Sequence, residues 1–106
     1  MSNFHMLLDD NGFLKNYTQW SIELAEYFAK QEDILLTPSH WKVIYFLRDY
    51  YQCHQNSPAI RLLVKSLKEK HGSEIGNSLY LQSLFPISPA VQSARIAGLP
   101  KPKRCI

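Results

Sequence analysis

The sequence predicts a mainly α-helical fold (α+β), a compact bundle of about five short helices with an N-terminal β-hairpin and an extended C-terminal arm. Its 106 residues, 45% of them hydrophobic, are enough for one core and too few for two. Apolar side chains recur at helical spacing between three hydroxyl–proline pairs, and two prolines with three cations follow Gly98. The expected organisation is therefore one helical domain over residues 1–98 and a flexible arm over residues 99–106.

The first expected element is the hairpin. Asn11-Gly12 is typical of a type I′ turn, because both residues tolerate the positive φ that this turn requires. Apolar segments over residues 4–8 and 13–15 flank the pair. We therefore predict a small β-hairpin at the start of the domain.

Three pairs predict helix starts, because a hydroxyl can cap a free backbone N–H and proline suits the first helical position: Thr37-Pro38, Ser57-Pro58 and Ser88-Pro89. The segment over residues 41–51 is apolar nearly all round and predicts a central buried helix. Gly72 and Gly98 are expected to end the third and the last helix. Three further groups have the spacing of helix faces that point into a core: Trp20, Leu24 and Phe28; Ile60, Leu63, Val64 and Leu67; and Tyr80, Leu81, Leu84 and Phe85.

The charge is unevenly distributed along the chain. Residues 1–60 carry four cationic and seven acidic side chains, whereas residues 61–106 carry eight cationic and two acidic ones. The basic second half indicates either a partner with an acidic or phosphate-bearing surface or an ordinary solvated face. Within it, Arg95, Lys101, Lys103 and Arg104 are the candidate partner-binding residues.

Two cysteines, Cys53 and Cys105, are too few for a disulfide scaffold and are expected to be free thiols in the cytoplasm. Neither a signal peptide nor an apolar run long enough for a membrane is expected. Cys105 lies on the arm among cations that favour a thiolate, so it is the candidate nucleophile. Cys53 lies in an apolar helix and is expected to be a core or boundary residue.

Other chemistries have little support in the sequence. The four histidines have no spacing that would place two of them with Cys53 in a metal site, so no metal and no cofactor are expected. The four glycines form no phosphate-binding loop, and no serine–histidine–carboxylate arrangement is evident.

Segments along nearly the whole chain resemble the TusE/DsrC family of sulfur-carrier proteins, and within it the TusE-type sulfurtransferases. The most specific match is the arm with its penultimate cysteine. The matching segments are Gly12-Phe13-Leu14, Trp20, Leu36-Thr37-Pro38-Ser39-His40-Trp41, Phe46-Leu47-Arg48-Asp49-Tyr50-Tyr51, Ser57-Pro58-Ala59-Ile60-Arg61, Gly76-Asn77-Ser78, Tyr80-Leu81, Leu84-Phe85-Pro86, and Ile96-Ala97-Gly98-Leu99-Pro100-Lys101-Pro102 with Cys105-Ile106.

The resemblance implies a cytoplasmic transferase that carries sulfur as a persulfide on Cys105. A TusBCD-type complex would supply the sulfur, and the tRNA 2-thiouridylase MnmA with bound tRNA would accept it for 2-thiolation of the wobble uridine; direct contact with tRNA stays open. DsrC proteins of dissimilatory sulfur metabolism carry a second cysteine eleven residues before the penultimate one, and this chain has Ala94 there. That difference favours a carrier with a single reactive cysteine over a DsrC-like partner of sulfite reductase.

Two further alternatives stay open at this point. Residues 57–70 and the short helix after them could form a helix-turn-helix with basic residues on its face, which would bind nucleic acid without needing Cys105. An adaptor of a sulfur-transfer assembly would bind its partners and support transfer equally well without the thiol.

Overall fold

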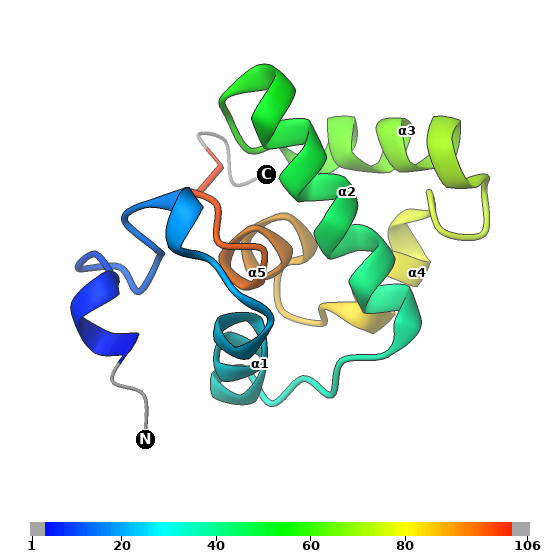
Figure 1. The fold of residues 1–106 in the computed structure, drawn as a ribbon. Coiled ribbons are helices and arrows are strands. Elements are labelled where there is room, and N and C mark those ends of the chain that lie inside the picture. The colour runs from blue at the N-terminus through cyan, green and yellow to red at the C-terminus, as the bar shows by residue number, and fades with distance from the viewer. Residues whose placement is uncertain (1–3, 103–106) are drawn as a thin grey trace.

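The computed structural model describes residues 4–102 of the chain and packs them as a mainly helical bundle, as expected (Figure 1). Within those residues, none of the helices combines the length and the apolar character needed to cross a membrane. The elements are two 3₁₀ helices, η1 (Phe4–Leu7) and η2 (Tyr17–Gln19), and five α-helices, α1 (Ile22–Gln31), α2 (Pro38–His54), α3 (Ile60–His71), α4 (Ser78–Leu84) and α5 (Pro89–Ile96).

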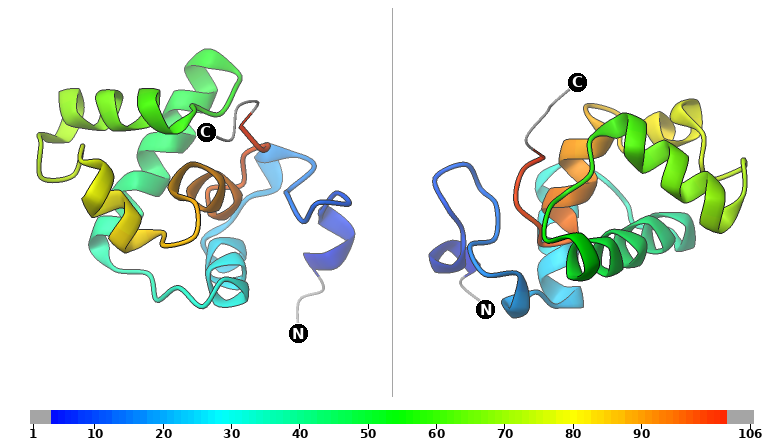
Figure 2. Two further views of the ribbon diagram at one scale, coloured as in Figure 1. Left: turned by 180° about the vertical axis from the view of Figure 1, so that it is seen from behind. Right: turned by 90° about the horizontal axis from the view of Figure 1, so that it is seen from above.

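Helix α5 lies in the middle of the bundle and contacts each of the other four α-helices (Figures 1 and 2). The buried side chains of α5 are small, so the backbones of the neighbouring helices can approach it closely from several sides. Ala90, Ser93 and Ala94 are all buried, and Ile96 adds a larger apolar group at the end of the helix. The last helix of the fold is thus its centre.

The predicted helix faces do form the core. Leu24 and Phe28 of α1, Leu63 and Leu67 of α3, and Leu81, Leu84 and Phe85 near α4 are all buried. Helix α2 differs from the expectation of an element buried all round. Val43, Ile44, Phe46 and Leu47 are buried, but Tyr45 is 47% exposed, so α2 buries one side and presents aromatic side chains on the other.

The prediction of an N-terminal β-hairpin is wrong. The described residues contain no strand, and the only pairing there is a single antiparallel bridge between Leu8 and Leu14. Of the two turn residues only Gly12 has a positive φ (81°), so the turn is not the type I′ turn that a hairpin needs. Asp9 closes the loop instead: its carboxylate accepts the N–H groups of Asn11 and Phe13, each at 2.9 Å. Residues before this loop coil into η1 and leave no strand to pair.

Two of the three expected helix starts are confirmed, and the third is wrong. Thr37 is the N-cap of α2 and forms a capping box with His40, while Ser88 is the N-cap of α5. Helix α3 begins at Ile60 with Ala59 as its N-cap, two residues beyond the expected start at Ser57-Pro58. The Ser57 hydroxyl donates instead to the Pro100 carbonyl at 2.6 Å, a contact between residues 43 positions apart.

Candidate functional site at the root of the arm

The candidate site is the segment that precedes Cys105 in the sequence. Cys105, Lys103 and Arg104 lie outside the described residues, so their predicted roles stay predictions. The structure does describe residues 98–102, which we call the arm root. Its geometry fixes where the chain leaves the domain.

A Schellman motif ends α5 and turns the chain into the arm root. The Gly98 N–H donates to the Arg95 carbonyl at 3.1 Å, and the Leu99 N–H donates to the Ala94 carbonyl at 2.9 Å. Gly98 has a φ of 75°, which side chains disfavour. A Cβ at this position would also lie 2.5 Å from Cδ1 of Trp20. Both the backbone and its neighbour therefore require glycine here.

Two side chains from distant parts of the sequence bind the last carbonyls of this turn. Trp20 Nε1 donates to the Ile96 carbonyl at 2.9 Å, and Arg48 Nη1 donates to the Ala97 carbonyl at 2.8 Å. The Arg48 guanidinium lies 4.2 Å from the ring centres of both Tyr17 and Trp20, and its Nη2 donates to the Tyr17 carbonyl at 3.1 Å. Burial lowers the pKa of Arg48, and the nearby tyrosines oppose that shift. Because an arginine stays charged at any ordinary pH, this cap does not switch near neutrality.

The arm root itself is packed on the domain. Leu99 is fully buried, Pro102 is buried, and the Pro100 carbonyl accepts the hydrogen bond from Ser57. Lys101 lies between them and is exposed. The expected division into residues 1–98 and a flexible arm stays a prediction, but Leu99, Pro100 and Pro102 are held against the domain.

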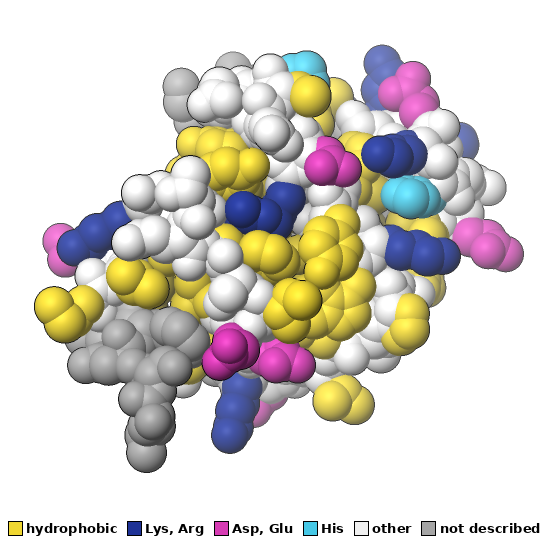
Figure 3. All heavy atoms as spheres, in the orientation of Figure 1, with side chains coloured by type: hydrophobic (Ala, Val, Ile, Leu, Met, Phe, Trp, Pro, Cys, Tyr) yellow, Lys and Arg dark blue, Asp and Glu magenta, His cyan; other side chains and the backbone are white. Residues whose placement is uncertain are grey.

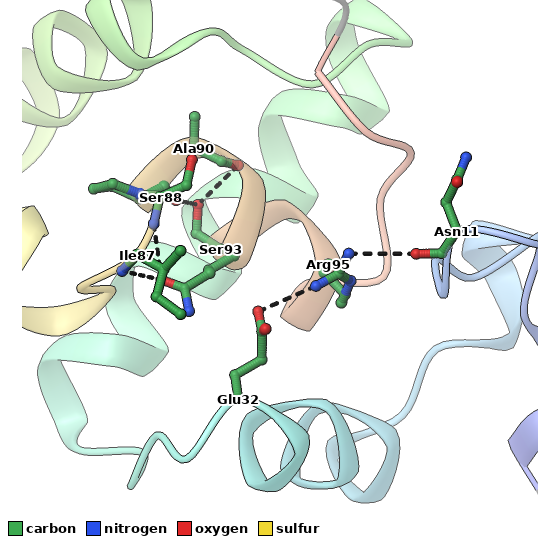
Figure 4. A network of polar contacts seen from close by, with 9 residues as sticks. Asn11, Glu32, Ile87, Ser88, Ala90, Ser93 and Arg95 are labelled. Carbon is green, nitrogen blue, oxygen red and sulfur yellow. Dashed lines mark hydrogen bonds and ion pairs between the residues drawn. The ribbon is translucent and has the colours of Figure 1, made fainter. Parts of the chain in front are cut away.

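Arg95, a predicted partner-binding residue, contacts groups of its own chain (Figure 4). Its Nη1 lies 3.3 Å from a Glu32 carboxylate oxygen, and its Nη2 donates to the Asn11 carbonyl at 3.3 Å. The guanidinium also lies 4.4 Å from the ring centre of Phe13. Arg95 thus ties the N-terminal loop and the end of α1 to α5, a structural role that the sequence reasoning missed. Its binding to a partner stays a prediction.

Cys53, the second thiol, lies at the C-terminal end of α2 and is exposed, not in the core or at its boundary as expected. The described residues hold no cluster of three or more histidine, cysteine or carboxylate side chains that could bind a metal. Buried His40 has a structural place: its Nδ1 faces the Thr37 cap and its Nε2 lies 2.8 Å from the Leu84 carbonyl.

The chain as a whole is similar to known proteins. The family model for DsrC-like proteins matches residues 1–106, the whole sequence. The chain belongs to the DsrC-like family. Among solved structures, this DsrC-like protein is similar to DsrC of Allochromatium vinosum, with 48% identity, a TM-score of 0.85, and coverage of 93% of this chain and 88% of that one. It is also similar to the oxidized gamma-subunit of the dissimilatory sulfite reductase (DsrC) from Archaeoglobus fulgidus, with 42% identity, a TM-score of 0.78, and coverage of 93% and 90%.

Curated relatives of this DsrC-like protein bear the name sulfurtransferase TusE. The protein from Yersinia pseudotuberculosis is 55% identical over 98 residues, which cover 92% of this chain and 91% of that protein. The one from Escherichia coli K12 is 53% identical, with coverage of 92% and 90%. The TusE homolog of Haemophilus influenzae is 52% identical over the same shares.

Sequence reasoning predicts roles for the thiol and its cations, but it does not find the residues that hold the arm root. Trp20 and Arg48 lie in segments that resemble the family, which is the only signal that sets them apart. Ser57 is expected to cap a helix and binds the arm root instead. Each of the three acts on a carbonyl at least 43 positions away, so local sequence patterns could not assign that partner.

Proposed function

We propose that this protein is a sulfurtransferase that carries sulfur as a persulfide on Cys105. It receives the sulfur from a TusBCD-type complex and passes it to an MnmA-type tRNA 2-thiouridylase, which thiolates the wobble uridine of tRNA. The observation that carries the proposal is the 52–55% identity to TusE sulfurtransferases over 92% of the chain. We further propose that the protein acts in the cytoplasm and needs no cofactor, because the sulfur is held covalently.

The proposed transfer needs one nucleophile and no net oxidation. The Cys105 thiolate attacks the outer sulfur of the donor's persulfide, a new sulfur–sulfur bond forms on Cys105, and the donor's own sulfur leaves as a thiolate. In the second step a thiolate of the acceptor attacks the outer sulfur now held on Cys105, the sulfur–sulfur bond on Cys105 breaks, and Cys105 leaves as a thiolate. Lys103 and Arg104, which precede Cys105 in the sequence, favour the thiolate form of its side chain.

The arm root suits this function because it presents the arm from a fixed point. The Schellman turn at Gly98, its two capping side chains and the Ser57 hydrogen bond together leave little freedom before Pro102. A nucleophile delivered from a fixed point loses less freedom on docking than one on a long loose tail.

Position 94 supports a single-cysteine carrier over a DsrC-like partner of sulfite reductase. Ala94 stands where DsrC proteins, by the resemblance, carry their second cysteine. It is buried in α5, with 1% of its surface exposed. The one other thiol of the sequence, Cys53, lies at the end of α2. Chemistry that pairs two arm thiols is therefore not proposed for this chain.

The test compares two matched cysteine variants. After incubation with the sulfur-donor complex, intact-mass spectrometry should show one added sulfur atom on the parent chain and on Cys53→Ser. We expect no such adduct on Cys105→Ser, together with loss of tRNA thiolation and an unchanged unfolding temperature. Loading of Cys105→Ser but not of Cys53→Ser would disprove the assignment, and full thiolation with Cys105→Ser would indicate an adaptor.

A further inference from the structure

A set of three aromatic side chains lies together on the outer side of α2. Tyr45 is 47% exposed and its ring stacks on that of half-buried Trp41, with centroids 5.8 Å apart and planes 29° apart. Trp20 meets the other side of Tyr45 edge-on at 6.1 Å. We call these three residues the aromatic face. Figure 3 shows a broad apolar patch in this orientation, with cationic and acidic side chains at its borders.

The aromatic face continues into a groove between α2 and the end of α3. The groove has a volume of about 500 Å³, and the rings of Trp41, Tyr45 and Phe46 line it. Its charged lining is mostly cationic, with Lys42 and Lys70 against the single carboxylate of Asp49. Trp and Tyr are the side chains that most often supply binding energy at protein interfaces. The cations at the edge suit an acidic partner surface.

The aromatic face is also continuous with the arm root. Trp20 contacts Gly98 and donates to the Ile96 carbonyl, so one end of the aromatic face is part of the turn that directs the arm. Cys105 follows Pro102 by three residues, which span at most about 11 Å. Any protein that exchanges sulfur with Cys105 must therefore come close to the surface around the arm root, which includes Trp20.

The character of the groove favours a protein over nucleic acid. Phosphate backbones are bound by several cations spread along a surface, whereas this groove is largely apolar and has Asp49 in its lining. The lysines of the groove also favour the sulfur donor over the sulfur acceptor as the binding partner. The acceptor holds tRNA and needs a cationic surface to do so, and Lys42 and Lys70 would repel that surface.

We propose that the aromatic face and its groove are the docking site for the sulfur-donating protein, whose matching surface presents apolar side chains bordered by carboxylates. This inference rests on the proposed function, since it names the donor of that same transfer. The aromatic rings supply the affinity, and the lysines set the orientation and the rate of encounter.

The test measures binding of the full-length chain to a purified TusBCD-type complex from the same organism. Tyr45→Ala removes the exposed ring, and Lys70→Glu reverses a charge of the groove. Each should raise the dissociation constant at least tenfold and slow sulfur loading in proportion at low donor concentration. Tyr45→Phe and Lys70→Arg should restore binding. Leu79→Ala is the matched control, because Leu79 is 82% exposed and lies outside the groove, and it should change binding less than twofold.

Three other results would overturn the inference. If all variants bound the donor equally and the donor fully loaded the parent, the aromatic face would not be the docking site. The proposed function would then still hold. Unchanged donor binding together with weaker binding of a tRNA transcript by Tyr45→Ala would make the aromatic face a nucleic-acid surface. Failure of the parent to bind or accept sulfur from the donor would overturn both proposals.

Discussion

Gly98 connects the helical core to the arm through three separate constraints. Its positive φ permits the turn, its N–H closes one hydrogen bond of the Schellman motif, and its missing side chain leaves room for the Trp20 ring. Trp20 and Arg48 in turn bind the carbonyls that α5 leaves free. At the scale of single residues, the direction of the arm is therefore set by backbone geometry and two capping side chains.

The substitution Gly98→Ala should destabilise the protein by about 2 to 4 kcal/mol, because it combines an unfavourable φ with a clash against Trp20. Gly12→Ala is the matched control, since Gly12 also has a positive φ (81°) but the place that its new methyl group would take lies 4.0 Å from its nearest neighbour, Arg95 Nε. That change should cost only about 1 kcal/mol. Urea unfolding of the two variants checks the difference, and equal costs would show that the contact with Trp20 does not matter.

At the scale of elements, the arm root is a packed extension of α5. Leu99 enters the core directly after the turn, Pro102 is buried, and Ser57 holds the carbonyl between them. The loop between α2 and α3 thus helps to hold the arm root, because it places the Ser57 hydroxyl within hydrogen-bond distance of the Pro100 carbonyl. The exposed hydrogen bond is the weakest of these contacts, so it is the place where the arm root would detach first.

We expect Ser57→Ala to loosen the arm root while leaving the domain folded. The lost hydrogen bond contributes about 1 kcal/mol locally. Hydrogen exchange at the Leu99 amide, which donates to the Ala94 carbonyl, should become several-fold faster, and the unfolding midpoint should hardly move. Ser83→Ala is the control, because the Ser83 hydroxyl makes a similar exposed bond to the Tyr80 carbonyl far from the arm. Identical exchange at Leu99 in the parent and in Ser57→Ala would show that the bond has no role in holding the arm root.

The helix starts show what local sequence can and cannot predict. Thr37-Pro38 and Ser88-Pro89 are predicted correctly because their role depends on neighbours within one helical turn. Ser57-Pro58 has the same local pattern, but its hydroxyl binds a carbonyl 43 residues away. The hairpin prediction fails for a different reason, because here a local contact decides: Asn11-Gly12 does turn the chain, yet the nearby Asp9 carboxylate selects a different turn. The roles of Cys105 and its cations are predicted without such contacts and stay predictions.

At the scale of the whole molecule, the basic half of the sequence places exposed cations on α3 and on the arm root. Helix α3 packs against α5, and its cations Arg61, Lys65 and Lys68 are exposed. Lys101 is exposed on the arm root. Arg95 is the exception, since Glu32 and Asn11 engage its guanidinium. The basic partner-binding surface therefore stays a prediction, and one of its expected members serves the fold.

The triple substitution of Lys101, Lys103 and Arg104 by alanine should slow association with the donor complex and flatten its dependence on salt. Exposed charges act mainly on the rate of encounter, and salt screens them over about 10 Å. The matched control is the triple substitution of Arg61, Lys65 and Lys68, which removes the same charge from α3. Stopped-flow association at low and high salt measures both. Equal rates and equal salt slopes for the arm variant and the parent would show that the arm is recognised without its cations.

The central position of α5 has a consequence for how the protein is made. The ribosome delivers α1 to α4 first, and each of them needs α5 to cover its apolar side. Translation must therefore proceed past Ile96 before the core can close. Cys105 follows the end of α5 by only a few residues, so the thiol is synthesised at almost the same moment as the core becomes able to fold. A nascent chain stalled before α5 has neither the fold nor the means to carry sulfur.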